Sequence, residues 1–180
     1  MFHFFILSLI ACSADEPKTA LGKNVIITST KVPEKKMDDY STKSFTCCDT
    51  KESSNLLAKY LELTRAMAAD NDQKTKKAVD DLSTLLKQAP FAEDNSLAEL
   101  KNGVEYWKTL TRKEIQEDFK APSQTFIDYA KKHTSDKGTQ IITGFCPMAN
   151  NNSGGHWLQT EKIISNPYFG SMMLTCGVFE

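Results

Sequence analysis

The chain has 180 residues and a formal net charge of −1, because 22 Lys and Arg residues nearly balance 23 Asp and Glu residues. A chain of this length can bury one ordinary hydrophobic core, so a single folded domain is expected. The charges are evenly mixed and form no basic stripe, which argues against nucleic acid as a partner. The apolar fraction, 40%, is that of a globular protein.

The strongest hydrophobic run is at the start of the chain, in residues 1–10. It is too short to cross a bilayer as a helix, which needs about 20 apolar residues, but it suits the core of a signal peptide. The run ends in Leu9-Ile10-Ala11-Cys12, which resembles the bacterial lipobox. We therefore expect residues 1–12 to be a lipoprotein signal peptide that ends in a lipidated Cys12. A plain secretory signal cut near the same place is the alternative.

Ser13, rather than Asp, follows the cysteine. By the same resemblance this favours a periplasm-facing protein anchored in the outer membrane. Residues 13–52 are rich in Lys, Thr, Ser and Asp and contain Pro17 and Pro33. This composition indicates a polar tether between the membrane and a folded domain over residues 53–180.

Apolar residues recur at steps of three and four from Ser53 onward, which predicts amphipathic helices. Asp70-Asn71-Asp72 is expected to end the first helix and cap the second, which Pro90 stops. Capping boxes at Ser96–Glu99 and Thr111–Glu114 predict the starts of a third and a fourth helix.

Pro122 lies inside the apolar stripe of the fourth helix, so we expect a kink or two abutting pieces there. Four amphipathic helices with short links bury their stripes most simply in an up-and-down four-helix bundle. The fold class predicted is therefore mainly α, followed by a C-terminal Cys/Met segment with a short β-hairpin. The strands of that hairpin are expected at residues 141–145 and 174–178, with a long Asn- and Gly-rich loop between them.

The candidate chemistry is in Cys146-Pro147-Met148 and in the run from Met172 to Cys176. Pairing of the two expected strands would bring Cys146 near Cys176. Met148 shares a side with Cys146 if the segment is extended, and Met173 shares a face with Cys176 if its segment turns. Two thiolates and two thioethers form the soft ligand set that selects Cu(I). His156 and Met172 are further candidate ligands.

A disulfide between Cys146 and Cys176 is an equally weighted alternative from spacing alone, because an exported protein meets an oxidising compartment. The domain would then be a non-catalytic structural or interaction module without metal. Cys47 and Cys48 are harder to interpret. Neighbouring cysteines rarely bond each other, so a second metal-capturing pair and bonds to distant cysteines both stay open.

No enzyme is expected. Cys146 and His156 are a nucleophile and a base in principle, but no orienting residue or oxyanion site accompanies them.

The C-terminal run adds a resemblance. Phe145-Cys-Pro-Met, Trp157-Leu158 and Ile164-Ser-Asn-Pro-Tyr-Phe-Gly-Ser-Met-Met-Leu-Thr-Cys-Gly177 resemble a bacterial domain-of-unknown-function family. That domain is often attached to, or encoded with, periplasmic adaptors of copper and silver efflux systems. Tyr60-Leu61 with Ala66, and Phe119 shortly before Ser123, are similar in the helical part.

The resemblance covers about Ser53 to Val178 and implies a helical bundle closed by the Cys/Met segment, with a role in metal handling. Membership would imply copper as the cargo and a heavy-metal efflux adaptor as a partner. Met172 and His156 are not part of the family pattern, and Cys47 and Cys48 lie outside the matched region. The matching positions are Cys146, Pro147, Met148, Trp157, Leu158, Asn166, Pro167, Tyr168, Gly170, Met173, Cys176 and Gly177.

Overall fold

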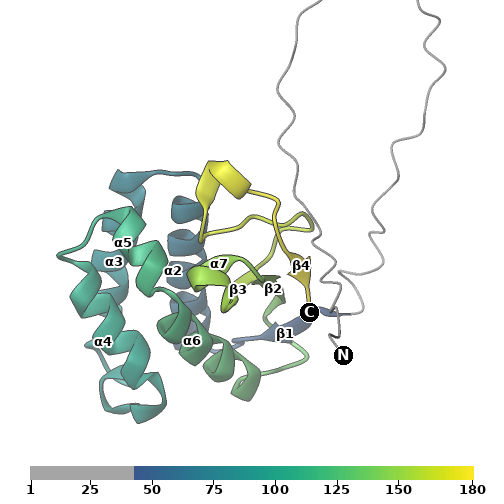
Figure 1. The fold of residues 1–180 in the computed structure, drawn as a ribbon. Coiled ribbons are helices and arrows are strands. Elements are labelled where there is room, and N and C mark those ends of the chain that lie inside the picture. The colour runs from purple at the N-terminus through teal and green to yellow at the C-terminus, as the bar shows by residue number, and fades with distance from the viewer. Residues whose placement is uncertain (1–42) are drawn as a thin grey trace, which may run out of the picture. The chain divides into compact units, whose positions relative to one another are not determined.

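A computed structural model describes residues 43–180, all of which lie in the unit Lys36–Glu180 (Figure 1). The expected signal peptide, Cys12 and the tether up to residue 42 lie outside the described residues. The strands are β1 (Phe45–Cys47), β2 (Thr139–Cys146), β3 (Gly155–Gln159) and β4 (Val178–Phe179). The α-helices are α2 (Lys51–Ala68), α3 (Asp72–Leu86), α4 (Ala98–Trp107), α5 (Arg112–Asp118), α6 (Lys120–Lys132) and α7 (Ala149–Asn152). Three short 3-10 helices are η1 (Phe91–Glu93), η2 (Asn95–Leu97) and η3 (Gly170–Met173).

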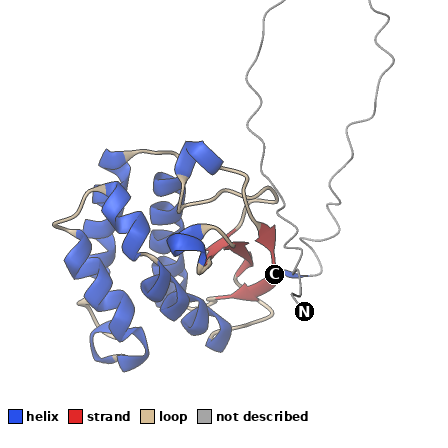
Figure 2. Ribbon diagram, in the orientation of Figure 1, coloured by secondary structure: helices blue, strands red, loops and turns tan. Residues whose placement is uncertain are grey.

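The described chain is mainly helical and has one small antiparallel sheet, as the sequence predicted. Helix α2 packs against α3, α3 against α4, and α4 against α6. The sheet adjoins this helical layer through β3, which contacts both α6 and α2. Figure 2 shows the helices gathered on one side of the described domain and the strands on the other. One continuous hydrophobic core therefore lies between the helices and the inner face of the sheet.

The helix boundaries follow the capping signals of the sequence with one exception. Asn71 caps α3 by accepting a hydrogen bond from the backbone of Lys74, and Thr111 forms a capping box with Glu114 at the start of α5. Helices α5 and α6 abut near Pro122, so the predicted division into two pieces is confirmed. The box predicted at Ser96–Glu99 is wrong, because η2 occupies this stretch and the helix begins at Ala98 without a side-chain cap.

Strand β2 is the centre of the sheet. Its first residues pair with β1, and its last five residues pair with β3, from Ile142 opposite Gln159 to Cys146 opposite Gly155. Strand β4 pairs with the same end of β2 on the other edge, through Gly144 and Phe145. The end of β2 that carries Cys146 is thus enclosed between two strands.

The predicted hairpin is corrected in its second strand. Strand β2 contains residues 141–145 as expected, but its hairpin partner is β3, which lies in the stretch assigned to a long loop. Residues 170–173 form η3, and pairing resumes only at Val178. Gly177 has a φ of 144°, a conformation that interrupts a regular strand and that residues with a side chain rarely adopt.

The folded domain also begins earlier than the sequence suggested. Strand β1 and the first residues of α2 fall within the range assigned to the tether, and Cys47 and Cys48 are fully buried. The polar residues around them hid a strand of only three residues, which is too short for a period-two pattern. Among the described residues, no helix is long and apolar enough to cross a membrane.

Candidate functional site

Cys146 is the last residue of β2 and is fully buried. Side chains alternate along a strand, so Cys146 faces the same side as Gly144, which packs against the buried Trp157 ring. The partner of Cys146 in β3 is Gly155, and the Tyr168 ring occupies the space that a side chain at this glycine would need. Burial raises the pKa of Tyr168, and the neighbouring Tyr60 and Cys146 add to the effect. Cys146 thus faces the core beside a protonated tyrosine.

Cys176 reaches the same end of β2 through the pairing of β4. Phe145 pairs with Val178, so one further step along the two strands brings Cys146 opposite Gly177, the residue next to Cys176. Cys176 is half-buried and packs against the core. Its backbone N–H donates to the carbonyl of Met173 at 3.0 Å. The chain therefore turns between Met173 and Cys176, as the spacing of three suggested.

The buried side chain of Asn166 holds this C-terminal loop in shape. Its Nδ2 donates to the carbonyl of Cys176 at 2.8 Å, and its Oδ1 accepts from the backbone of Tyr168 at 2.9 Å. Its own backbone N–H donates to the carbonyl of Leu174 at 2.8 Å. Asn166 thus sets where the backbones of Cys176 and its neighbours lie.

A second anchor ties the same loop to the turn between α2 and α3. Asp70 accepts a hydrogen bond from the backbone of Ser171 at 2.9 Å and pairs with Arg112 at 2.7 Å. The hydrogen bonds from Ser171 lower the pKa of Asp70 first, and Arg112 adds to the effect. Gly170 has a φ of 57°, and a side chain there would overlap the Asp70 carboxylate. Glycine is therefore required where η3 begins.

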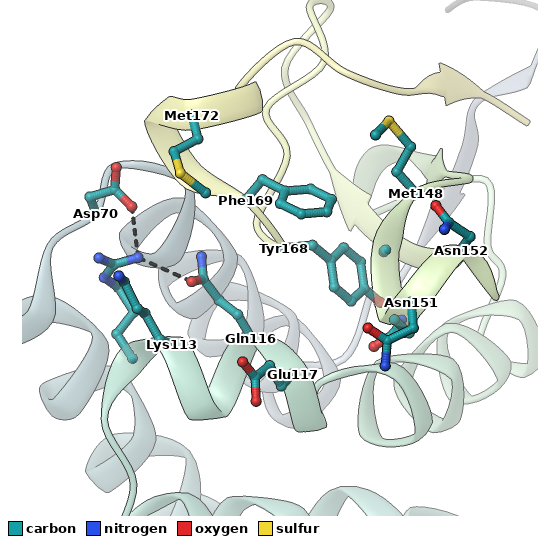
Figure 3. Close-up of a pocket in the computed structure, with 13 residues that line it drawn as sticks. Asp70, Lys113, Gln116, Glu117, Met148, Asn151, Asn152, Tyr168, Phe169 and Met172 are labelled. Carbon is teal, nitrogen blue, oxygen red and sulfur yellow. Dashed lines mark hydrogen bonds and ion pairs between the residues drawn. The ribbon is translucent and has the colours of Figure 1, made fainter. Parts of the chain in front are cut away.

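Met148 and Met172 lie on opposite sides of one pocket, with Phe169 between them (Figure 3). The pocket has a volume of about 910 Å³. Met148 is 38% exposed and Met172 is 78% exposed, whereas Met173 is half-buried. Strand β2 ends at Cys146, and Met148 immediately precedes α7. Met148 therefore lies outside the extended segment that was expected to align it with Cys146.

His156 faces away from Cys146. It pairs with Phe145 across β2 and β3, and alternation places these two side chains on the face opposite Cys146. The imidazole lies against the Phe145 ring in a tilted arrangement with 4.6 Å between ring centroids, and its Nε2 lies 3.0 Å from a carboxylate oxygen of Glu180. The sheet therefore does not bring His156 to the thiol of Cys146.

The two cysteine pairs lie at opposite ends of β2. Cys47 pairs with Thr139, the first residue of the strand, and Cys146 is the last. Seven residue steps of about 3.4 Å separate these ends by about 24 Å. Cys47, Cys48 and Cys146 carry free thiols. Residues 43–180 contain no cluster of three or more His, Cys, Asp or Glu side chains placed to hold a metal.

The pocket itself was not foreseen from the sequence. Asn150, Asn151 and Asn152 are consecutive residues with φ between 52° and 66°, and they form one of its walls. Asparagine tolerates this conformation better than most residues, so the Asn run was the one local signal. The lining also includes Arg112, which is 12% exposed and is held by ion pairs to Asp70 and Asp72. The Asn run and Arg112 line one pocket only because tertiary packing brings them together.

Comparison of the chain with known protein families, with curated proteins and with solved structures gave no match.

Proposed function

We propose that the domain binds a soft metal ion, Cu(I), through Cys146 and Cys176, with Met148 and Met173 as further ligands. The observation that carries this proposal is the pairing of β4 with the end of β2, which brings the two cysteine-bearing segments together. Thiolates and thioethers are the ligands that favour Cu(I) over harder ions. The role is one of binding and not of catalysis.

The exposure of the proposed ligands suits an ion that must enter and leave. Met148 is partly exposed at the pocket, Met173 and Cys176 are half-buried, and Cys146 is fully buried. An ion would meet a thioether first and a buried thiolate last. A thioether has no proton to lose and is not consumed in disulfides, so the methionines would keep some affinity if the thiols are oxidised.

The cellular role follows from the sequence and the family resemblance. With Cys12 acylated, the domain would face the periplasm from the outer membrane and buffer copper or pass it to an efflux adaptor. Helices α2, α3, α4 and the pair α5–α6 would be the four members of the predicted up-and-down bundle, a description supported by the packing of α2 on α3 and of α4 on α6. Detergent partitioning of the wild type and of Cys12→Ala tests the anchor, which is refuted if both proteins stay in the aqueous phase.

The full Cys146 burial also fits the second candidate, a structural module in which Cys146 and Cys176 form a disulfide and no metal binds. A quantitative bond in protein taken from the envelope without reductant, stable to mild reduction, would favour that reading, because structural disulfides have low reduction potentials.

The test of the metal site is a titration of reduced protein with Cu(I) against a chromophoric competing chelator. Cys146→Ala/Cys176→Ser should take up one Cu(I) fewer per chain than the wild type, where Ala avoids placing a hydroxyl in the core. Met148→Leu/Met173→Leu should bind the same ion more weakly. Met172→Leu is the matched control and should compete like the wild type, since this side chain is 78% exposed. Equal uptake by the wild type and the cysteine variant would refute the site.

A further inference from the structure

Cys47 and Cys48 are neighbouring thiols at the end of β1, and both have no exposed surface. The two side chains come from consecutive residues of the core, and both thiols are free. Tyr129 lies beside them, and its pKa is raised to about 12 by burial first and then by Cys48, Asp94 and Cys47. The pair is thus a dithiol in the core, next to a phenol that stays protonated.

The backbone around the pair is fixed by contacts to the link between α6 and β2. The N–H of Cys48 donates to the carbonyl of His133 at 3.0 Å, and its carbonyl accepts from the Ser54 hydroxyl. Thr46 accepts from the backbone of Ser135 at 3.0 Å. Cys48 has a φ of 66°, a left-handed conformation that residues with a side chain rarely adopt. The backbone that carries the two thiols is therefore held in place by the fold.

The spacing of adjacent residues does not suit a disulfide between Cys47 and Cys48. The Cα atoms of adjacent residues are about 3.8 Å apart across a trans peptide, whereas disulfides usually join Cα atoms about 4.4–6.8 Å apart. A bond between Cys47 and Cys48 would be strained and easily reduced. A metal ion between the sulfurs lengthens the bridge, because each metal–sulfur bond is about 2.3 Å long, as for zinc, against about 2.05 Å for one S–S bond.

The surroundings restrict which ion fits. No third His, Cys, Asp or Glu among residues 43–180 joins the pair in a cluster. Structural zinc sites need four ligands, and calcium needs six or more oxygen atoms. Two thiolates alone suit a soft monovalent ion that accepts two ligands.

We propose that Cys47 and Cys48 together bind one soft monovalent ion, Cu(I) or Ag(I), as a two-thiolate complex separate from Cys146 and Cys176. The ion replaces the thiol protons, which pass to solvent, and no electron is transferred. The site is independent of the proposed function.

Entry of the ion requires a local opening, because both thiols are buried. Strand β1 has three residues and lies at one end of the sheet order, where it pairs with β2 and where Cys47 also forms an isolated bridge with Thr134. Short edge strands open at a lower free energy than the core of a domain. Uptake at this pair should therefore be slower than at the half-buried Cys176.

Native mass spectrometry with Ag(I) tests the proposal on the reduced full-length chain carrying Cys12→Ala, which removes the fifth cysteine. The decisive protein is Cys146→Ala/Cys176→Ser, in which the buried pair is intact. It should bind one Ag(I), and alkylation after denaturation should leave the peptide containing Cys47 and Cys48 unlabelled. Failure of this protein to bind Ag(I), or binding with both cysteines labelled, would overturn the proposal.

The companion variant Cys47→Ala/Cys48→Ala separates the two sites. If both sites exist, the Cys12→Ala chain binds two Ag(I) and each double variant made in it binds one. If only the site at Cys47 and Cys48 exists, the Cys12→Ala chain binds one Ag(I). In that case Cys47→Ala/Cys48→Ala binds none and Cys146→Ala/Cys176→Ser still binds one. Circular dichroism of each variant confirms folding, and the decisive arm does not depend on substituting the buried pair.

Discussion

The hydroxyl of Tyr60 connects the helices to the sheet that carries Cys146. It is 2.6 Å from Ser123 Oγ on α6 and accepts a hydrogen bond from the backbone of Leu158 on β3 at 3.3 Å. The Ser123 hydroxyl donates to the carbonyl of His156 at 2.8 Å, so its oxygen accepts the Tyr60 proton. Burial raises the pKa of Tyr60, which keeps that proton in place. Both hydroxyl groups in this buried chain of hydrogen bonds therefore have a hydrogen-bond partner.

Tyr60→Phe should lower the free energy of unfolding by about 1–3 kcal/mol, because it leaves the buried Leu158 N–H without an acceptor. Urea denaturation followed by circular dichroism measures the change. Tyr106→Phe removes the same atom from a side chain that is 56% exposed and should leave the midpoint unchanged. Equal midpoints for the two variants would contradict the structural role given to Tyr60.

The ligand roles given to the cysteine, methionine and histidine residues stay predictions, and the structure bears only on where these residues lie. Cys146 and Cys176 were expected to meet through strand pairing, and β4 does bring their segments to one end of β2. The position of His156 depended on a strand that was not foreseen. Alternation along β3 then turned its side chain to the opposite face.

Among the elements, α4 and α6 approach each other closely at Gly103. A methyl group at this position would lie 2.5 Å from Pro122 Cγ. Gly103→Ala gains about 1 kcal/mol of helix propensity, but the proline ring sits in a packed core and yields little. We expect net destabilisation by about 1–3 kcal/mol in thermal or urea unfolding. Asn102→Ala, at the exposed neighbouring position, should be neutral or slightly stabilising, and a stabilising Gly103→Ala would show that the helices can move apart.

Helices α3 and α4 are also joined by charge. Glu105 accepts a hydrogen bond from Ser83 and pairs with Lys87 at 3.0 Å and Lys108 at 3.3 Å. These contacts, the Ser83 hydrogen bond first, lower the pKa of Glu105 to about 2 from an ordinary value of 4.5. Because the carboxylate is favoured in the folded state, its stabilisation is complete above pH 4.5 and is lost as the pH falls toward 2.

Glu105→Gln should therefore lower stability at pH 7 and lose this effect in acid. The side chain is 45% exposed, so solvent screening limits the expected difference to about 1 kcal/mol or less. Urea midpoints of the wild type and the variant, measured from pH 7 to pH 2, should converge below pH 4.5. A difference that is constant over this range would show that the charge of Glu105 is not its cause.

The predicted helix starts are confirmed where a local signal in the sequence is strong. Apolar periodicity and the caps at Asn71 and Thr111 determine where helices α3 and α5 begin, and neither depends on tertiary contacts. Strand β3 was missed because its flanking Asn and Gly residues also suit a loop. Gly155 suits this strand position because the Tyr168 ring, from another segment, occupies the space that a side chain there would need. A contact of this kind cannot be seen from the order of residues in the sequence.

At the scale of the whole molecule, the core is formed by apolar side chains from both the helices and the sheet. Its largest fully buried members include Trp107, Trp157, Phe119 and Phe126. None of these is a metal ligand, so the domain should fold without metal. Reduced protein in the presence of a chelator should keep its helical circular dichroism and a cooperative unfolding transition. Loss of most of the helical signal would mean that the Cys/Met segment holds the fold together, as in small metal-dependent domains.

The proposed copper site is a set of sulfur ligands from two segments of the chain, one at Cys146 and one at Cys176. X-ray absorption spectroscopy of the Cys12→Ala chain that also carries Cys47→Ala/Cys48→Ala, loaded with one equivalent of Cu(I), tests it most directly, because this protein retains only the thiols of Cys146 and Cys176. The account predicts a first shell of sulfur alone, whose sulfur count falls when Met148→Leu/Met173→Leu is added. A first shell containing nitrogen or oxygen, or a spectrum unchanged by the methionine substitutions, would contradict it.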